Sequence, residues 1–175
     1  SMKVRQAARP LMEQIARETG CTVNLGMRDR LKVVYVDTCR VDQGNIFQPD
    51  IGSTRPLLSS SIGRALLLAA SSAERTAILN RLKVSEPEEY ATQLPNLAKD
   101  EKAFASRGYC YSCGDWRREI HAVAVPIRQA PGEECLALNA TMSAFRLKDD
   151  TLQREVAPRL REAALAIEHA SGVYS

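Results

Sequence analysis

Apolar residues recur every three or four positions at both ends of the chain, as they do in a helix that buries one face. Near the N-terminus this pattern covers residues 4–20, and Pro10 within it predicts that a new helix begins there. Near the C-terminus the pattern covers residues 148–172, with a kink predicted at Pro158. Two amphipathic helices are therefore expected at the two ends of the chain.

The segments between these helices contain runs of β-branched and aromatic residues, which predict strands. The predicted strands cover residues 21–29, 31–40, 109–115, 120–128 and 135–142. The first two should form a hairpin, and so should the last two, across a turn at residues 129–134. Residues 41–52 have the turn-forming composition of a loop.

The middle of the chain is rich in helical signals. The predicted helices there cover residues 62–70, 72–82 and 87–107. Ser72 is the expected cap of the second helix, Pro95 should break the third, with Asn96 as a new cap, and Gly108 should end it. Because no repeat and no interior linker occurs, the sequence predicts a single α+β domain over residues 1–175.

Composition narrows the class of protein. The chain has 175 residues, of which 45% are hydrophobic and 26% charged, as in a soluble globular domain. It has no apolar run long enough to cross a membrane and no apolar core of a secretion signal, so we expect a cytoplasmic protein without membrane contact. The net charge of +3 is too small to indicate nucleic-acid binding by this chain. Five scattered cysteines without a secretion signal indicate free thiols.

The stretch GYCYSCGDW, residues 108–116, contains a Cys-x-x-Cys pair, which can bind a metal or carry out redox chemistry. In a strand, however, Cys110 and Cys113 point to opposite faces and cannot chelate one ion. A redox-active pair opens a helix, whose dipole lowers a thiol pKa, and no helical pattern follows here. Motifs of hydrolytic or phosphate-binding enzymes are also missing. We therefore expect no metal, no cofactor and no catalytic residue.

Several local sequences together resemble the effector-binding domain of IclR-type bacterial transcriptional regulators. They are LMEQIARETGCTVNLGMRD, VVYVD, GSTRPLLSSSIGRALLLA, SRGYCYSCGDW, AVAVPIR and LNATMSAFRL, and the resemblance extends from about Ala8 to Gly172. It implies a GAF-like domain, in which a twisted antiparallel sheet of about six strands is flanked by helices and carries a small-molecule pocket. It also implies a homodimer or tetramer.

The resemblance further implies that DNA is bound only through an N-terminal winged helix-turn-helix domain. The residues before Ala8 are too few to hold one, so we expect this chain to lack it and residues 1–9 to be the remnant of a linker helix. The expected function is a non-catalytic sensor, in which a small organic effector, carboxylate-bearing or aromatic, changes the arrangement of the oligomer and so the binding of DNA. The alternative is a GAF-like thiol redox enzyme of the free methionine sulfoxide reductase type that uses Cys110 and Cys113.

The resemblance places the ligand site at four points of the chain. The first is a helix start with Ser60, Ser61 and Ile62, where backbone N–H groups favour an anion, although the serines could serve only as helix caps. The second is Ser112, at a position where the family often has an acid. The third is Ala122, which replaces a family cysteine, and this loss of polar anchors indicates a larger or more apolar ligand.

The fourth point is the last strand, where Asn139 and Thr141 alternate and therefore share one face, although solvent could wet that face instead. Cys110 shares a strand face with the serine at the second point. Phe47 and Trp116 are expected to be apolar walls of the pocket, or else ordinary core residues.

Overall fold

The computed structural model describes residues 2–47 and 50–174. Its centre is an antiparallel sheet with the strand order β3-β2-β1-β7-β6-β5, in which β4 also pairs with β2. The strands are β1 (Thr22–Asp29), β2 (Lys32–Asp42), β3 (Asn45–Phe47), β4 (Thr54–Pro56), β5 (Cys110–Cys113), β6 (Ile120–Ile127) and β7 (Leu136–Ser143). The prediction of about six antiparallel strands is confirmed, and both predicted hairpins, β1–β2 and β6–β7, are present.

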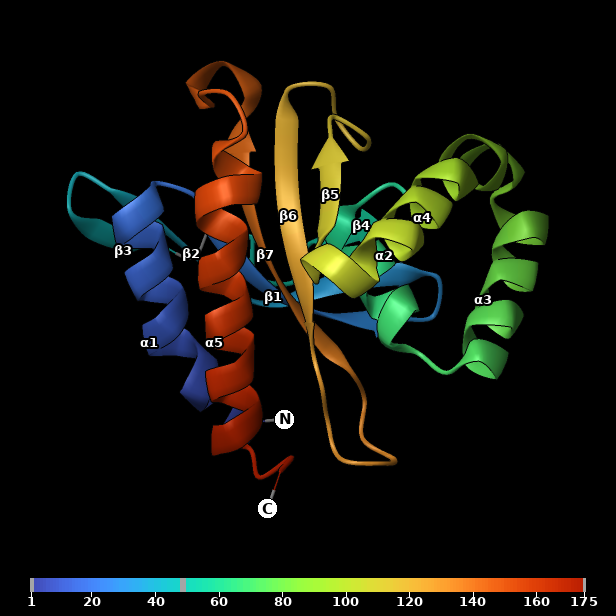
Figure 1. The fold of residues 1–175 in the computed structure, drawn as a ribbon, viewed down its shortest axis with the longest axis horizontal. Helices are drawn as coiled ribbons and strands as arrows, with labels where there is room; N and C mark the ends of the chain where they lie inside the picture. The colour runs from blue at the N-terminus through green and yellow to red at the C-terminus, as the bar shows by residue number, and fades with distance from the viewer. Residues whose placement is uncertain (1, 48–49, 175) are drawn as a thin grey trace.

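Helices lie on both faces of this sheet (Figure 1). They are α1 (Met2–Thr19), α2 (Ser61–Ala69), α3 (Ser72–Ser85), α4 (Pro87–Arg107) and α5 (Ala157–Ala170), with a 3-10 turn at Ala144–Arg146 and a π-helical turn at Leu152–Val156. α1 and α5 pack side by side on one face, whereas α2 packs on the other, with α4 and α3 farther out. Within residues 2–47 and 50–174, no helix is both long and apolar enough to cross a membrane.

Two hydrophobic clusters stabilise the fold, one on each face of the sheet. The cluster under α1 and α5 includes Met12 and Leu160, and the cluster under α2 includes Leu58 and Leu67. Each fully buried side chain of this size stabilises the fold by about 1.5–3 kcal/mol. Because α2 is short, it covers only part of its face, and the sheet beside it carries polar side chains.

The predicted break at Pro10 is wrong, because α1 is continuous. Proline lacks an N–H group and removes one helical hydrogen bond. The helix nevertheless buries Val4 and Ala8 before the proline and Met12 after it. Shared burial of these side chains favours one unbroken helix over two.

The predicted break at Pro95 is wrong for a similar reason. α4 continues through it and buries Leu97 and Asp100 in the following turn. The Asn96 side chain donates a hydrogen bond to the side chain of Gln93 within the same helix and does not cap a new one. The helix ends as predicted at Gly108, which has a φ of 74°.

Two other local predictions are corrected by the structure. The segment predicted as a loop, residues 41–52, contains the short edge strand β3. The cap of α3 is Ser71, whose hydroxyl accepts a backbone N–H three residues on, and not Ser72. The C-terminal helix has a π-helical turn at Leu152–Val156, and Pro158 follows it in the first turn of α5, where its missing N–H costs least.

Candidate functional site

A cavity of about 320 Å³ opens on the sheet beside α2. Its floor includes a row of paired residues that crosses four neighbouring strands. The row is Ser112 on β5, Ala122 on β6, Thr141 on β7 and Thr22 on β1. Residues paired across adjacent strands project to the same face, so these side chains lie together although they are far apart in the sequence. The volume is at the lower end of the range for small-molecule sites.

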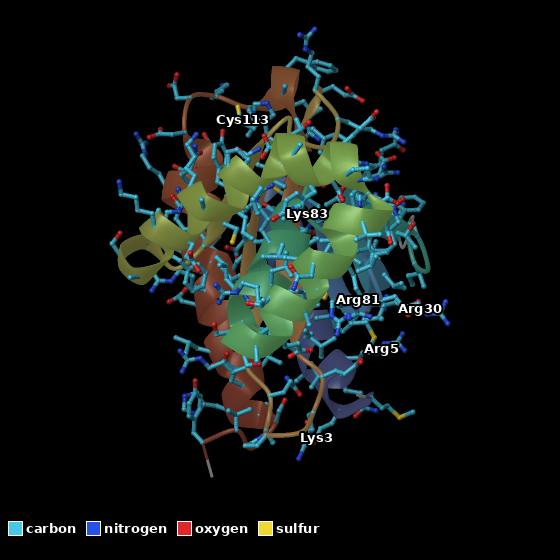
Figure 2. The ribbon with its side chains drawn as sticks, turned by 90° about the vertical axis from the view of Figure 1, so that its right-hand side faces the viewer. Lys3, Arg5, Arg30, Arg81, Lys83 and Cys113 are labelled. Carbon is cyan, nitrogen blue, oxygen red and sulfur yellow. The ribbon has the colours of Figure 1, made fainter. Side chains whose placement is uncertain are left out.

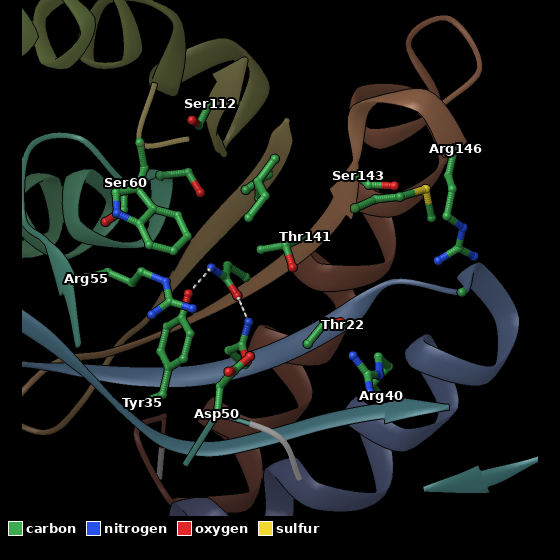
Figure 3. A pocket seen from close by; sticks show the side chains of 18 residues that line it. Thr22, Tyr35, Arg40, Asp50, Arg55, Ser60, Ser112, Thr141, Ser143 and Arg146 are labelled. Atoms are coloured by element: carbon green, nitrogen blue, oxygen red, sulfur yellow. Dashed lines mark hydrogen bonds between the residues drawn. The ribbon is translucent and has the colours of Figure 1, made fainter. Parts of the chain in front are cut away.

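An adjacent row carries a buried hydrogen-bond network. The Nδ2 atom of Asn24 donates to Oδ1 of Asn139 over 2.7 Å, and the Thr38 hydroxyl donates to Oδ1 of Asn24 over 2.5 Å. Nδ2 of Asn139 donates to the Tyr35 hydroxyl over 3.1 Å (Figure 3). Asn24, Tyr35 and Asn139 all line the cavity, as predicted for Asn139. The protein itself therefore fixes the orientation of the Asn139 amide.

Two predicted site residues, Cys110 and Ile62, lie on this side of the sheet but outside the cavity lining. Cys110 pairs with Ala124 on β6, in the part of the face that α2 covers. Ile62 is fully buried, close to Gly26 of β1. Cys110 does share a face with the cavity residue Ser112, as expected, but that face continues beneath the helix.

Three serines precede or begin α2, and each has a different role. The Ser59 hydroxyl donates to Oε2 of Glu89 over 2.7 Å. Ser60 is the N-cap, and its hydroxyl both accepts a backbone N–H of the first turn and donates to a backbone carbonyl. Ser61 is 1% exposed, and its hydroxyl has no hydrogen-bond partner among the described residues. A buried polar group without a partner costs about 1–3 kcal/mol, so Ser61 is the serine that a ligand would satisfy.

A close backbone contact positions the start of α2 at the cavity. A Cβ atom at Gly63 would lie 2.0 Å from the carbonyl oxygen of Leu57, so only glycine allows this approach. The first turn of a helix has unpaired N–H groups and a partial positive charge. Since Ser60 and Ser61 both border the cavity, that charge faces it.

The guanidinium group of Arg55 lies between two aromatic rings at the edge of the cavity. Its Cζ atom is 4.1 Å from the ring centroid of Trp116 and 4.7 Å from that of Tyr35. Trp116 thus borders the cavity and holds a cation there. Burial raises the pKa of Tyr35, and the nearby arginine partly opposes this shift. The phenol therefore stays neutral at pH 7 and can donate a hydrogen bond to a ligand.

A buried arginine fixes the loop that carries Trp116. Arg64 of α2 is completely buried, and its Nε atom bonds to Oδ2 of Asp100 on α4 over 2.7 Å. Its Nη2 atom bonds to Oδ2 of Asp115 over 2.9 Å and to the carbonyl of Tyr111 over 2.7 Å. These bonds join α2, α4 and the segment after β5, and so place Trp116 at the cavity.

Phe47 does not line the cavity. It lies on β3 at the edge of the sheet, is 44% exposed and pairs with Arg40 of β2. The prediction that Phe47 forms an apolar wall assumed a loop that folds over the sheet, whereas an edge strand holds this residue away from the floor.

The two cysteines of the Cys-x-x-Cys pair have opposite environments. Cys110 is buried in the core, whereas Cys113 is exposed near one end of the molecule (Figure 2). Burial raises the pKa of the Cys110 thiol, which disfavours the nucleophilic thiolate. Sγ of Cys113 is 3.8 Å from Nε2 of His121, but no group of three or more potential metal ligands occurs among residues 2–47 and 50–174. The redox alternative therefore gains no support, and each of the five cysteines is a free thiol.

The sequence reasoning missed the charged residues that border the cavity. They are Arg40, Asp50, Arg55 and Arg146. It also missed Thr22 and Asn24, although their alternation on β1 has the same spacing as that of Asn139 and Thr141 and could have revealed them. The charged residues come from strand ends and turns, and only the tertiary structure brings these to one cavity.

A profile of the family described as "Bacterial transcriptional regulator IclR C-terminal" matches residues 1–169. HTH-type transcriptional regulator XynR of Escherichia coli (strain K12) is 26% identical over 179 residues, which cover 98% of this chain and 68% of XynR. An IclR family transcriptional regulator from Brucella abortus, known from a crystal structure, is 36% identical with a TM-score of 0.86, over 95% of this chain and 63% of that one.

A further solved structure is that of an IclR homologue from Microbacterium hydrocarbonoxydans complexed with 4-hydroxybenzoate. It is 23% identical, with a TM-score of 0.73 over 98% of this chain and 69% of that one, and shows likeness of fold alone. The chain thus spans only about two thirds of the length of these relatives. Because the family profile covers nearly the whole chain, the chain belongs to the C-terminal, GAF-like effector-binding domains of IclR-family bacterial transcriptional regulators.

Proposed function

We propose that this domain binds a small organic acid in the cavity beside α2 and is not itself catalytic. In the longer protein, binding would change the arrangement of a dimer or tetramer and so the affinity of an N-terminal domain for DNA in the cytoplasm. The effector must then bind one arrangement more tightly than the other, because a ligand shifts an equilibrium only by its difference in affinity.

The hydroxyl of Ser61 is the single observation that carries this proposal. It is buried, lacks a partner among the described residues and borders the cavity at the start of α2. A carboxylate at this point would accept a hydrogen bond from the hydroxyl and interact with the positive end of the helix dipole. The complex of the Microbacterium homologue with 4-hydroxybenzoate, itself a carboxylic acid, is consistent with such a ligand.

Other residues of the cavity would orient the rest of the ligand. The neutral Tyr35 hydroxyl and the Thr141 hydroxyl can donate hydrogen bonds, and Arg55 adds a positive charge held by Trp116. Ala122 leaves room on the floor between Ser112 and Thr141. The proposed ligand therefore has an anionic group near α2 and a body that rests on the sheet.

Thermal unfolding with a panel of small carboxylic acids, including 4-hydroxybenzoate, tests the proposal. A ligand that binds only the folded state at 100 times its dissociation constant adds about 2.7 kcal/mol of stability. Once a stabilising acid is found, calorimetry should show that Ser61→Ala weakens its binding about tenfold or more, the loss expected for a hydrogen bond to a charged group.

The neighbouring serine provides the matched control. Ser59→Ala removes a hydroxyl that bonds to Glu89 and does not border the cavity, so it should leave the affinity unchanged. The proposal fails if Ser61→Ala binds the acid as tightly as the unmodified chain, or if no acid in the panel raises the unfolding temperature.

A further inference from the structure

The cavity has a second polar end, away from α2. Ser143 lies there at the end of β7, and its buried hydroxyl lacks a hydrogen-bond partner among the described residues. Arg40 and Arg146 border the same end, and Figure 3 shows both on the far side of Thr141 from Arg55. Of the ion pairs within residues 2–47 and 50–174, none includes Arg40 or Arg146.

The two ends are joined by one strand. Asn139, Thr141 and Ser143 alternate on β7, and all of them border the cavity. At about 3.3 Å per residue, the Cα atoms of Asn139 and Ser143 lie roughly 13 Å apart.

The charges around the cavity are unequal. Asp50 is the carboxylate among the lining residues, against the guanidinium groups of Arg40, Arg55 and Arg146. Arg40 and Arg146 are exposed, so water screens part of their repulsion. An anionic group between them would replace this repulsion by attraction and would satisfy the Ser143 hydroxyl.

We propose that the effector is a small organic dianion, in which the two anionic groups bind at opposite ends of the cavity. One carboxylate would lie at Ser61 and the start of α2, and the other would lie between Ser143, Arg40 and Arg146. This inference rests on the proposed function, because it assumes an acid in the cavity, and it adds a second point of recognition. A linear dicarboxylate is the simplest ligand of this class.

Isothermal calorimetry with two matched series of acids tests the inference. The first series comprises the linear dicarboxylates from succinate to pimelate, and the second comprises the monocarboxylates of the same chain lengths. At least one dicarboxylate should bind about tenfold or more tightly than its matched monocarboxylate. This advantage should shrink as the salt concentration rises, because exposed charges are screened.

Three variants test whether the tighter binding of dicarboxylates comes from the end of the cavity at Ser143. Arg146→Met and Arg40→Met should each reduce dicarboxylate binding and leave monocarboxylate binding unchanged. Arg154→Met removes an exposed arginine outside the cavity lining, which pairs with Asp150, and should change neither series.

The outcomes separate this inference from the proposed function. Equal binding of matched mono- and dicarboxylates, with Ser61→Ala still weakening both, would overturn the dianion and leave the acid site intact. Equal losses for both series in Arg146→Met would overturn it as well. Binding of neither series would overturn the dianion, whereas the proposed acid site fails only if no acid of the wider panel binds.

Discussion

The Asn24 and Asn139 side chains bond to each other over 2.7 Å across β1 and β7, at the boundary between the apolar core under α2 and the cavity. Both residues are almost fully buried. Each amide has a further protein partner, the hydroxyl of Thr38 or that of Tyr35. The network therefore serves both the stability of the sheet and the shape of the cavity floor.

Asn139→Leu should destabilise the domain by about 2 kcal/mol, since it leaves the Asn24 amide and the Tyr35 hydroxyl without their partner. Thr141→Val on the same strand face should change the free energy of unfolding by less than about 0.5 kcal/mol, because the Thr141 hydroxyl borders the cavity and no internal bond is lost. Urea titration of both variants measures this difference. Equal stability losses would show that the network is not a structural unit.

Arg64→Met should cost about 3–5 kcal/mol, because it leaves the buried carboxylate of Asp100 with Arg107 as its remaining ion-pair partner and removes the cation bound to Asp115. Arg154→Met removes an exposed ion pair with Asp150 and should cost less than about 1 kcal/mol. Chemical denaturation compares the two. A loss in Arg64→Met no larger than that in the control would contradict the role given to this network.

Thiol labelling at pH 8 should show one fast-reacting cysteine in the folded protein and five in denaturant. Cys113 is exposed, whereas Cys21, Cys39 and Cys110 are buried. Burial also raises the pKa of the half-buried Cys135 to about 11, which slows its reaction. Cys113→Ser should abolish the fast phase, and a fast phase that survives this change would place a second reactive thiol at the surface.

Stability should fall as the pH rises above about 9. Burial, with a contribution from Asp37, raises the pKa of Cys39 from 9.0 to about 12. Between these values the unfolded chain releases the thiol proton and the folded domain retains it, so ionisation favours unfolding. Cys39→Ala should make the decline between pH 9 and pH 11 shallower by up to about 1.4 kcal/mol per pH unit. Parallel pH profiles of the two proteins would refute this assignment.

Hydrophobic periodicity predicted most of the fold, because the spacing of apolar residues along the chain marks the buried face of each helix or strand. The strands β1, β2, β5, β6 and β7 and the two terminal helices follow directly from it. The errors at Pro10 and Pro95 have one cause. A local rule counts the hydrogen bond that proline removes, whereas the folded helix also gains from burying side chains on both sides of it.

The sequence alone determined that Asn139 and Thr141 share one face of β7, since alternate residues of a strand project to the same side. Only the tertiary structure decided which residues of that face stay open to a ligand. α2 covers Cys110 but stops short of Ser112. The tertiary structure also decided the charge of the cavity. Arg40, Arg55 and Arg146 come from separate segments, and no local sequence pattern predicts that these segments meet. Long-range packing, which depends on the whole chain at once, sets both features.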